Sequence, residues 1–582
     1  MPAKPSGKIK KSTIRSIRKN GDIYLLERET EYDPEKKYNK VISTRLISKI
    51  PKGTENPVPT RPKLANGEKG KIKSGIIDAT RKRIGMTAIL NHIGQVSGID
   101  NALYASTDIG TAQKIISLAR YWVATEGASL PGIVVWQYNH KLPYEDGLSE
   151  DIYHDLFTKI GYDEKLQQQF FKARSTLLSL GDSIAYDSTT ISTYSTNQID
   201  ARRGFNKDGD GLNTIKFLVL YSINQRQPIA FTLQPGNLPD VTSITNAINQ
   251  LSIFTIKSPE MVTDGGYYGE MNLSELFQAG IDFITLADKD VTWIRSVIDA
   301  NRDKFTEYSA YCPGDPTIAG ITVHFMHTFI KEQKYGSQKK NMVAGDTEEF
   351  DRKVYLHIYF NEAKRASDRE NLIRDLQYLQ HEIEDGVPVD TFSKKYQKMV
   401  KTYFTIRKWG DKIKVLANDE AIRNALPYHG FFVLISSREN DTWKCLRKYR
   451  RRNTIESFFE ADKGRADGKK PRVWNAETLR GRMFVQFIAL SYYEYLNELI
   501  RNLKSTLGKK TGDSEHDKKK VLGSELNLKS WLENTPLYLQ LQWFDAIEGV
   551  DISTKLAHKR WNTETTERDR LYLEKLGVTL KQ

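Results

Sequence analysis

The stretch Ser183-Ile-Ala-Tyr-Asp-Ser-Thr-Thr-Ile-Ser192 begins the part of the chain that decides the fold. Its β-branched and aromatic residues predict a strand, and two further strands are predicted at 216–222 and 227–233. The pattern then predicts a helix at 241–251, a strand at 261–264 that ends at Asp264, a second helix at 272–279 and a fifth strand at 282–287. This order, β-β-β-α-β-α-β, predicts a mixed α/β fold with helices packed on a mixed sheet.

The sequence on either side of this unit predicts further regions. Residues 76–180 are periodic like amphipathic helices, with Ser149 and Asp163 as N-caps. In 291–436 mostly strands are predicted, with one helix that a capping box at Ser367 and Glu370 would begin. The predicted domains are 1–75 (basic tail, β hairpin and Pro-rich connector), 76–180 (helical, DNA-binding), 181–290 (first part of the α/β unit), 291–436 (β-rich insertion), 437–505 (second part of the unit, with a basic helix at 443–463 and an apolar one at 477–503) and 506–582 (helical C-terminal region).

Composition limits the class of protein. The chain has 582 residues, 39% of them hydrophobic and 10% aromatic, which is enough to bury a core and excludes wholesale disorder. No apolar stretch is long enough to span a bilayer, so no membrane is expected. The N-terminus does not resemble a secretory signal, and two cysteines cannot build a disulfide framework. We therefore expect a cytoplasmic protein.

The net charge of +14 favours a polyanionic partner. Half of it lies between Lys444 and Arg472, where 11 residues are basic and 4 are acidic. A solvated helix face is the alternative explanation of such a run.

For 76–180, short helices with tight turns are compatible with a helix-turn-helix, but helical packing alone is the commoner explanation.

Two aspartates are predicted at the ends of neighbouring strands. Asp187 lies at or near the end of the first strand and Asp264 ends the fourth, and in an open mixed sheet these strands can lie side by side. Two carboxylates at one edge of a sheet suit Mg²⁺ or Mn²⁺. Asp at a strand end is also ordinary turn chemistry, although the glycines that follow Asp264 allow a close approach of substrate.

Glu456 is the candidate for a third carboxylate. At about 100° per residue, Tyr449, Arg452, Glu456 and Lys463 fall within a stripe about 60° wide on one helix. Ile455 and Phe458 would then face the core. The alternative is that Asn453 and Glu456 form an N-terminal capping box.

The segment Asn206-Lys-Asp-Gly-Asp-Gly211 imitates the start of an EF-hand loop. Phe217 stands where the loop needs a bidentate Glu, so a calcium site is rejected. A connection between the first two strands is predicted instead.

The spacing Tyr449-x₂-Arg452-x₃-Glu456-x₆-Lys463 resembles the Tyr–Arg–Glu–Lys signature of a large group of bacterial insertion-sequence DDE transposases. The segments around Asp187 and Asp264 look like the first two acidic motifs of that group. Residues 236–240 resemble its loop after the third strand. The resemblance covers about 180–490 and, more loosely, the first 75 residues.

This resemblance implies a ribonuclease H-like catalytic domain, interrupted by a β-rich insertion, that catalyses DNA transposition. Asp187, Asp264 and Glu456 would be catalytic and would hold two Mg²⁺ or Mn²⁺ ions. The implied partner is double-stranded DNA, both the inverted repeats at the transposon ends and the target, bound by a homodimer in a synaptic complex. Such a protein would act at the bacterial nucleoid.

Further DNA-binding residues follow from the signature and from the basic run. The expected set is Tyr449, Arg452, Lys463, Arg450, Arg451, Lys448 and Arg465. Some relatives hold a flipped base on an aromatic ring, so Trp293 and Trp443 are candidate stacking platforms, although a Trp is more often part of the core. Two other functions stay open: a ribonuclease H-like nuclease that never joins strands, and a non-catalytic DNA-binding protein derived from a transposase.

Overall fold

The computed structural model describes residues 9–33, 36–59, 76–179, 181–204, 206–254, 259–332, 343, 345–409, 412–465, 473–509, 515–554 and 557–580. The chain divides into two compact units, one of Met1–Arg81 with Gly549–Thr563 and one of Lys82–Glu548 with Glu564–Lys581. None of the helices in the described ranges combines the length and apolar character that a membrane crossing requires.

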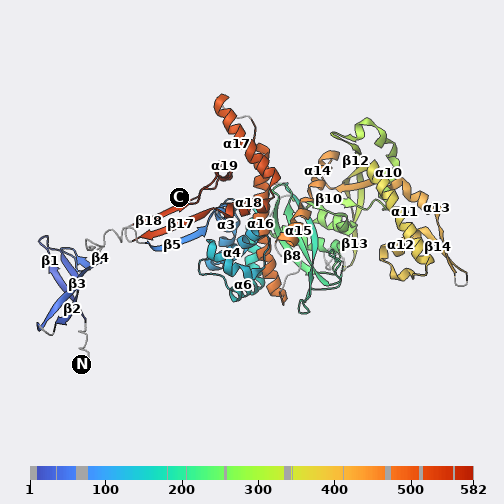
Figure 1. The fold of residues 1–582 in the computed structure, drawn as a ribbon. Helices are drawn as coiled ribbons and strands as arrows, with labels where there is room; N and C mark the ends of the chain where they lie inside the picture. Colours follow the sequence, from blue (N-terminus) through green and yellow to red (C-terminus); the bar gives the residue numbers. More distant parts are fainter. Residues whose placement is uncertain are drawn as a thin grey trace. The chain divides into compact units, whose positions relative to one another are not determined.

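The first unit consists of two small sheets (Figure 1). One has the order β1-β2-β3-β4, with strands Lys10–Ile17, Ile23–Asp33, Tyr38–Ile50 and Val58–Pro59. The other has the order β18-β17-β5, with strands His558–Asn562, Glu548–Thr554 and Ile76–Arg83. The structure thus has a sheet where a tail and a hairpin were expected, and a strand pair in the C-terminal region where only helices were expected. Residues 60–75 of the predicted connector lie outside the described residues.

Six helices form the helical region that the sequence predicted near 76–180. They are α2 (Gly85–Val96), α3 (Ile99–Ser106), α4 (Ile109–Thr125), α5 (Ile133–Asn139), α6 (Glu150–Tyr162) and α7 (Glu164–Ser175). The two predicted N-caps are confirmed, because Ser149 accepts a hydrogen bond from the Ile152 amide and Asp163 accepts one from the Leu166 amide.

A nine-stranded mixed sheet forms the centre of the second unit, in the order β11-β12-β13-β16-β10-β9-β6-β7-β8 (Figure 1). Its first five strands in the sequence are β6 (Ser183–Thr193), β7 (Asn213–Ser222), β8 (Gln227–Pro235), β9 (Glu260–Thr263) and β10 (Asp282–Ala287). The helices between them are α8 (Ile244–Ile253) and α9 (Glu270–Gln278). The predicted order of elements is confirmed: β6, β7 and β8 pair antiparallel, whereas β9 lies parallel to both β6 and β10.

The sheet continues beyond β10 with strands from the segment 291–436. These are β11 (Tyr311–Cys312), β12 (Asp315–Glu332), β13 (Thr347–Asn361) and β16 (Phe431–Ser436), and β16 pairs antiparallel with β10. Four helices also lie in this segment, so the expectation of a single helix is wrong: α10 (Thr292–Ala300), α11 (Glu362–Glu384), α12 (Lys394–Tyr403) and α13 (Asp419–Ala425). Asn361 caps α11, so the capping box predicted at Ser367 and Glu370 is wrong as well.

Part of this segment has a hydrophobic core of its own. The hairpin of β14 (Phe404–Trp409) and β15 (Lys412–Ala417) packs with α11 and α12 around Leu376, Leu379 and Val400. We refer to residues 362–425 as the α11–α13 body.

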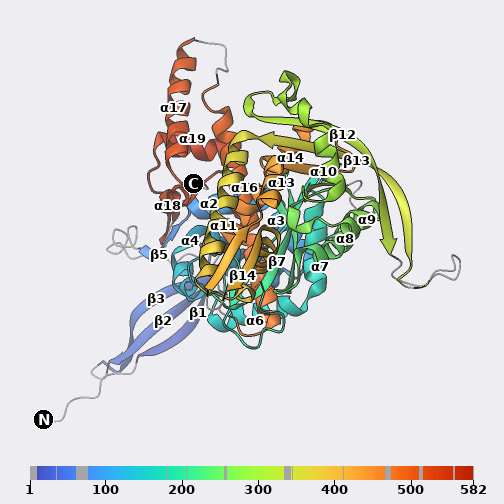
Figure 2. The same cartoon turned by 90° about the vertical axis from the view of Figure 1, so that its right-hand side faces the viewer.

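The chain then returns to the sheet through α14 (Thr442–Arg451), α15 (Thr454–Arg465) and α16 (Ala476–Thr506). Helix α16 is the apolar helix predicted at 477–503, and nearly all of its residues from Thr478 to Tyr492 are buried. Helix α16 contacts α4 and α6 of the helical region and also β8 of the sheet, and Figure 1 shows it between them. Figure 2 shows the same fold turned by 90°, with α11 and β14 toward the viewer. The last helices are α17 (Glu515–Asn534), α18 (Leu537–Asp545) and α19 (Glu567–Leu576).

Two glycines allow α16 to pack directly on the backbone of α6. A Cβ atom at Gly161 would collide with the carbonyl oxygen of Glu477, and one at Gly481 would collide with that of Phe157. Neither backbone oxygen can rotate away, so this helix pair needs glycine on both sides.

We predict that Gly481→Ala destabilises the protein by about 1–3 kcal/mol, because the overpacked helices must separate. Chemical denaturation measures this change. Gly523→Ala is the matched control, since Gly523 lies in α17 with no atom near its missing side chain. That substitution should stabilise the protein by about 0.5–1 kcal/mol through the higher helix propensity of alanine. Equal effects at the two positions would contradict the close-packing explanation.

Candidate active site

Asp187 and Asp264 lie at the same level of the sheet, Asp187 on β6 and Asp264 directly after the neighbouring parallel strand β9. The register pairs Tyr186 with Thr263, so each aspartate is the residue that follows a paired position. Strands β6 and β9 therefore lie side by side, as the sequence analysis expected. Asp187 lies within β6 and not at its end, however, because β6 continues along β7 as far as Thr193.

Glu456 reaches the same place from the first turn of α15. The opposite side of this helix is anchored in the core by Ile455 and Phe458, both fully buried, as predicted. The ring of Phe458 packs against Phe217 and Tyr221 of β7. This packing fixes α15 over the sheet and leaves the Glu456 side chain 54% exposed.

The single helix predicted over 443–463 is interrupted at Arg452 and Asn453, where α14 ends and α15 begins. Arg452 itself keeps right-handed helical dihedral angles. The Glu456 amide donates to the backbone carbonyl of Asn453. The signature residues therefore remain grouped, but on two helices.

The guanidinium of Arg452 contacts all three carboxylates. Its Nη1 lies 3.1 Å from Asp187 Oδ2, and its Nη2 lies 3.7 Å from Asp264 Oδ2 and 3.3 Å from Glu456 Oε1. Asp264 Oδ2 and Glu456 Oε1 both lie near Nη2, so the distance between these two oxygens cannot exceed the sum of their distances to that nitrogen. Only 6% of the Arg452 side chain is exposed, and its guanidinium packs 5.4 Å from the Tyr449 ring centroid. One buried cation thus joins three acids that are far apart in the sequence.

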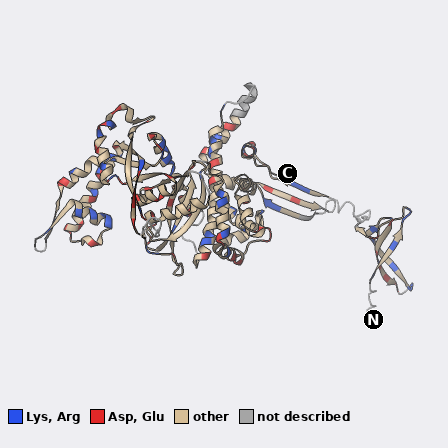
Figure 3. Ribbon diagram, turned by 180° about the vertical axis from the view of Figure 1, so that it is seen from behind, with Lys and Arg blue, Asp and Glu red and all other residues tan. Residues whose placement is uncertain are grey.

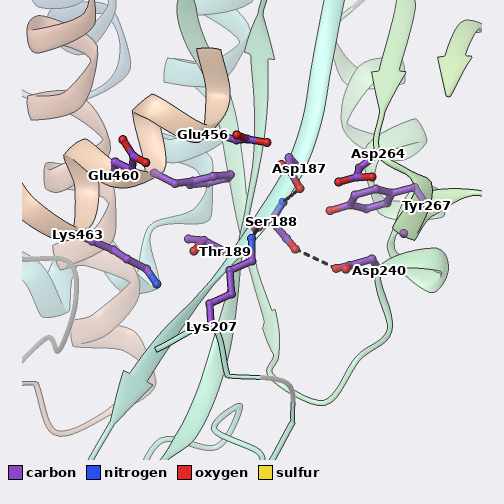
Figure 4. Close-up of a pocket in the computed structure, with 12 residues that line it drawn as sticks. Asp187, Ser188, Thr189, Lys207, Asp240, Asp264, Tyr267, Glu456, Glu460 and Lys463 are labelled. Carbon is purple, nitrogen blue, oxygen red and sulfur yellow. Dashed lines mark hydrogen bonds between the residues drawn. The ribbon is translucent and has the colours of Figure 1, made fainter. Parts of the chain in front are cut away.

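The acids line a pocket of about 380 Å³ (Figure 4). Its described lining carries five carboxylates, two lysines, two hydroxyl side chains, two rings and a glycine: Asp187, Asp240, Asp264, Glu456, Glu460, Lys207, Lys463, Ser188, Thr189, Tyr267, Phe459 and Gly266. The phenol oxygen of Tyr267 is buried and has no hydrogen-bond partner among the described residues. The lining can therefore attract cations and can also offer donors to an anion.

Burial and charge act in opposite directions on Asp187. Burial raises its pKa to about 6, whereas Arg452 and the Ser188 amide, which donates to it, favour the ionised form. Burial also raises the pKa of Tyr449 to about 12, so its phenol stays protonated at neutral pH. A cation in the pocket would stabilise the Asp187 carboxylate.

Both lysines of the pocket involve the link between β6 and β7, since Lys463 contacts a residue of the link and Lys207 belongs to it. Lys463 Nζ lies 3.0 Å from Asp208 Oδ1, and Lys207 Nζ donates to the backbone carbonyl of Ser188 at 2.8 Å. The link is the segment that imitates an EF-hand, and the prediction that it connects two strands is confirmed.

The other residues expected to bind DNA are divided between ion pairs and solvent. Lys448 pairs with Glu260 and Glu439, Arg450 lies 3.9 Å from Asp315, and Arg451 is exposed. The side chain of Arg465 lies outside the part of the chain that the structure describes.

Neither candidate stacking platform lines the pocket. Trp293 is stacked with Phe325 and His327, and its indole N–H donates to Glu270. The ring of Trp443 packs beside Tyr359.

The three candidate ligands, Asp187, Asp264 and Glu456, are among the five carboxylates that line the pocket. Carboxylates are hard oxygen ligands of the kind that Mg²⁺ and Mn²⁺ prefer. Within the described ranges, no three Asp, Glu, His or Cys side chains already form a group that could hold a metal ion. The guanidinium of Arg452 is the cation that contacts all three of these acids in the structure.

Several lining residues were not among the candidates from sequence. Asp240 accepts hydrogen bonds from Ser188 Oγ and Lys216 Nζ, at 2.9 and 2.6 Å. Asp240 is the last residue of the 236–240 loop that the family resemblance had singled out. That resemblance could therefore have identified Asp240 as a lining residue. Glu460 lies one helical turn after Glu456, where a pocket along α15 would be expected to extend.

The fold and the pocket define a mixed α/β protein with a cluster of acids beside basic side chains. Residues 179–491 match the family model described as the transposase DDE domain. This match covers more than half of the chain, which therefore belongs to the DDE transposase family. No curated protein matches the chain. Among solved structures, the chain is similar to the piggyBac transposase in its synaptic complex with hairpin DNA, at 9% identity and a TM-score of 0.32, over 79% of this chain and 81% of that one.

Asp462 generates a prediction about pH. It is fully buried on α15, neither of its carboxylate oxygens has a hydrogen-bond partner among the described residues, and burial raises its pKa to about 7. The folded protein therefore keeps a proton here between about pH 4 and pH 7 that the unfolded chain has lost, so its stability falls as the pH rises through this window.

We predict that Asp462→Asn stabilises the protein above pH 7 by up to about 4 kcal/mol, because the amide never becomes charged. The gain over wild type should grow from pH 4 to pH 7 and then level off. Denaturant unfolding at a series of pH values measures it, with the exposed Asp303→Asn as control. A gain independent of pH would contradict the assignment.

Proposed function

We propose that this protein is a transposase of the bacterial insertion-sequence group with the Tyr–Arg–Glu–Lys signature. It would cut DNA at the ends of its element and join the freed 3′-OH to target DNA. The observation that carries the proposal is the pocket shared by Asp187, Asp264 and Glu456, within the part of the chain that matches the family.

The order of the central strands supports a ribonuclease H-like catalytic domain. The third, second, first, fourth and fifth strands of the unit lie side by side in that order, with the first and fourth parallel. In this proposal 291–436 is an insertion that adds strands to the edge of the sheet and carries the α11–α13 body.

Asp187, Asp264 and Glu456 would hold two Mg²⁺ or Mn²⁺ ions. Such ions, when bound, lower the pKa of a water or a 3′-OH and stabilise the leaving oxygen of a phosphodiester. The chain's own residues would position the DNA. Lys463 and Lys207, which line the pocket (Figure 4), can pair with phosphates.

Arg452 would have two tasks. Before ions bind, its guanidinium keeps three mutually repelling carboxylates together. If ions were to neutralise the acids instead, the guanidinium would be free to make a two-point contact with a phosphate beside the pocket. The remaining signature residue, Tyr449, would support Arg452 through its ring. The protein would act as a homodimer on two element ends, at the nucleoid of the bacterial cytoplasm.

We predict that Asp187→Asn, Asp264→Asn and Glu456→Gln each reduce cleavage at element ends by at least about 100-fold, because each removes a carboxylate that the ions need. Cleavage of a labelled end duplex in Mg²⁺ measures this. Asp303→Asn, an exposed acid away from the pocket, should cleave like wild type. Undiminished cleavage by the Asp187 variant would reject the assignment.

A duplex with a pre-cut 3′-OH should be joined to target DNA by the wild-type protein. The same three substitutions should abolish joining, since one site performs both steps. Gel analysis of joined product measures this outcome, and cleavage without joining would identify a nuclease instead.

We predict that Arg452→Gln lowers the stability of the ion-free protein by about 3 kcal/mol and increases the rise in melting temperature caused by Mn²⁺. The acids lose their cation, so ions gain more by binding. Differential scanning fluorimetry with and without Mn²⁺ measures both effects. Lys448→Gln, which breaks an ion pair outside the pocket, should leave the Mn²⁺ effect unchanged. An equal Mn²⁺ effect in Arg452→Gln and wild type would refute the proposed competition.

A further inference from the structure

Helix α12 of the α11–α13 body exposes almost nothing but lysine. Its exposed residues are Lys394, Lys395, Lys398, Lys401 and Thr402. Its other side packs into the core of the body through residues that include Tyr396, Met399 and Val400. We refer to the four lysines as the lysine face. At about 100° per residue, Lys394, Lys398 and Lys401 lie within a stripe about 60° wide, without an acid between them.

The hairpin that follows continues this charge. Arg407 of β14 lies directly opposite Lys414 of β15, and both side chains are exposed. Like charges in directly opposed positions of a hairpin repel each other. From Lys394 to Lys414 the sequence has eight basic residues and one acidic residue, a net charge of +7 over 21 residues. This density exceeds that of the signature segment.

The lysine face is not neutralised within the molecule. Lys395 lies 3.4 Å from Asp375, but Lys394, Lys398 and Lys401 form no ion pair with any described residue. Neighbouring α11 shows the contrast, because it has six acids to four Lys and Arg. Two of those four cations pair locally, Lys364 with Asp368 and Arg365 with Glu362. Lysines at i, i+4 and i+7 destabilise an isolated helix, so the fold alone does not explain them.

We propose that the lysine face, with Arg407 and Lys414, binds the phosphate backbone of duplex DNA without reading its sequence. Figure 3 shows the basic residues along α12 in the α11–α13 body. Flexible lysine side chains suit phosphates at varied positions, and each contact releases a condensed counterion. A protein partner fits less well, because protein interfaces are depleted in Lys and are centred on aromatic residues, which α12 does not expose.

This second surface is distinct from the acid pocket, since none of its residues lines the pocket and the α11–α13 body has its own core. The inference rests on the proposed function in one respect: the DNA it names is the substrate of the transposase. The surface would hold DNA beyond the point of reaction and would raise affinity for any sequence.

The test compares three full-length proteins, all carrying Asp187→Asn so that DNA is bound without being cut. The first has no further change, the second has Lys394→Gln/Lys398→Gln/Lys401→Gln, and the third has Arg365→Gln/Arg369→Gln/Arg374→Gln on α11. Fluorescence anisotropy with a random-sequence duplex gives the affinity at several salt concentrations. The α12 variant should lose up to about 2.7 units of the slope of log affinity against log salt, about 0.9 for each phosphate contact. The α11 control should keep the parent slope.

Two outcomes would overturn the inference. One is an α12 variant with the same slope and affinity as the α11 control. The other is loss of binding to polyglutamate with unchanged DNA binding, which would assign the lysine face to an acidic protein. The melting temperature of each variant checks that it is folded. Removing the mutual repulsion of the lysines should not lower the stability of the α12 variant. The proposed function can fail independently of this inference. In that case the wild-type protein would neither cleave nor join DNA, while the difference in DNA binding between the α12 and α11 variants would persist.

Discussion

The contact between the Arg452 guanidinium and three carboxylates is the interaction on which the candidate site depends. Asp187, Asp264 and Glu456 come from a strand, a strand end and a helix, and close approach of three acids in a half-buried pocket is unfavourable without a cation. The guanidinium is planar, permanently charged and able to contact several oxygens at once. The buried arginine at this position therefore keeps the acids together.

The sheet and the helix that surround this contact fix its geometry. Parallel pairing of β6 with β9 brings the two aspartates together, and the aromatic packing of Phe458 on β7 sets α15 above them. The interruption between α14 and α15 falls at Arg452, the residue whose guanidinium contacts the acids. Each element is stabilised by apolar contacts away from the pocket, so the polar site is built on a rigid apolar frame.

Sequence periodicity was sufficient for the order of the central elements and for the apolar helix α16, because each buries a regular face. It was not sufficient where long-range pairing decides the structure. The joining of β16 to β10 and the breadth of the sheet depend on partners distant in the chain. The three acids were proposed from their positions and the signature, but the helical wheel assumed an unbroken helix. The signature assigned Arg452 to phosphate, and in the folded chain its guanidinium contacts the acids themselves.

The two basic segments of the chain show why charge density alone does not identify a surface for DNA. In the signature segment Arg452, Lys463 and Lys448 each face a carboxylate of the same chain, so much of that charge stabilises the site. On α12, three of the four lysines face no described carboxylate. A polyanion gains most where cations are not already neutralised, because no internal ion pair must be broken first. The balance of charge in the folded chain therefore separates cations that organise the pocket from cations that remain available to DNA. Counts of charged residues in the sequence cannot provide this distinction.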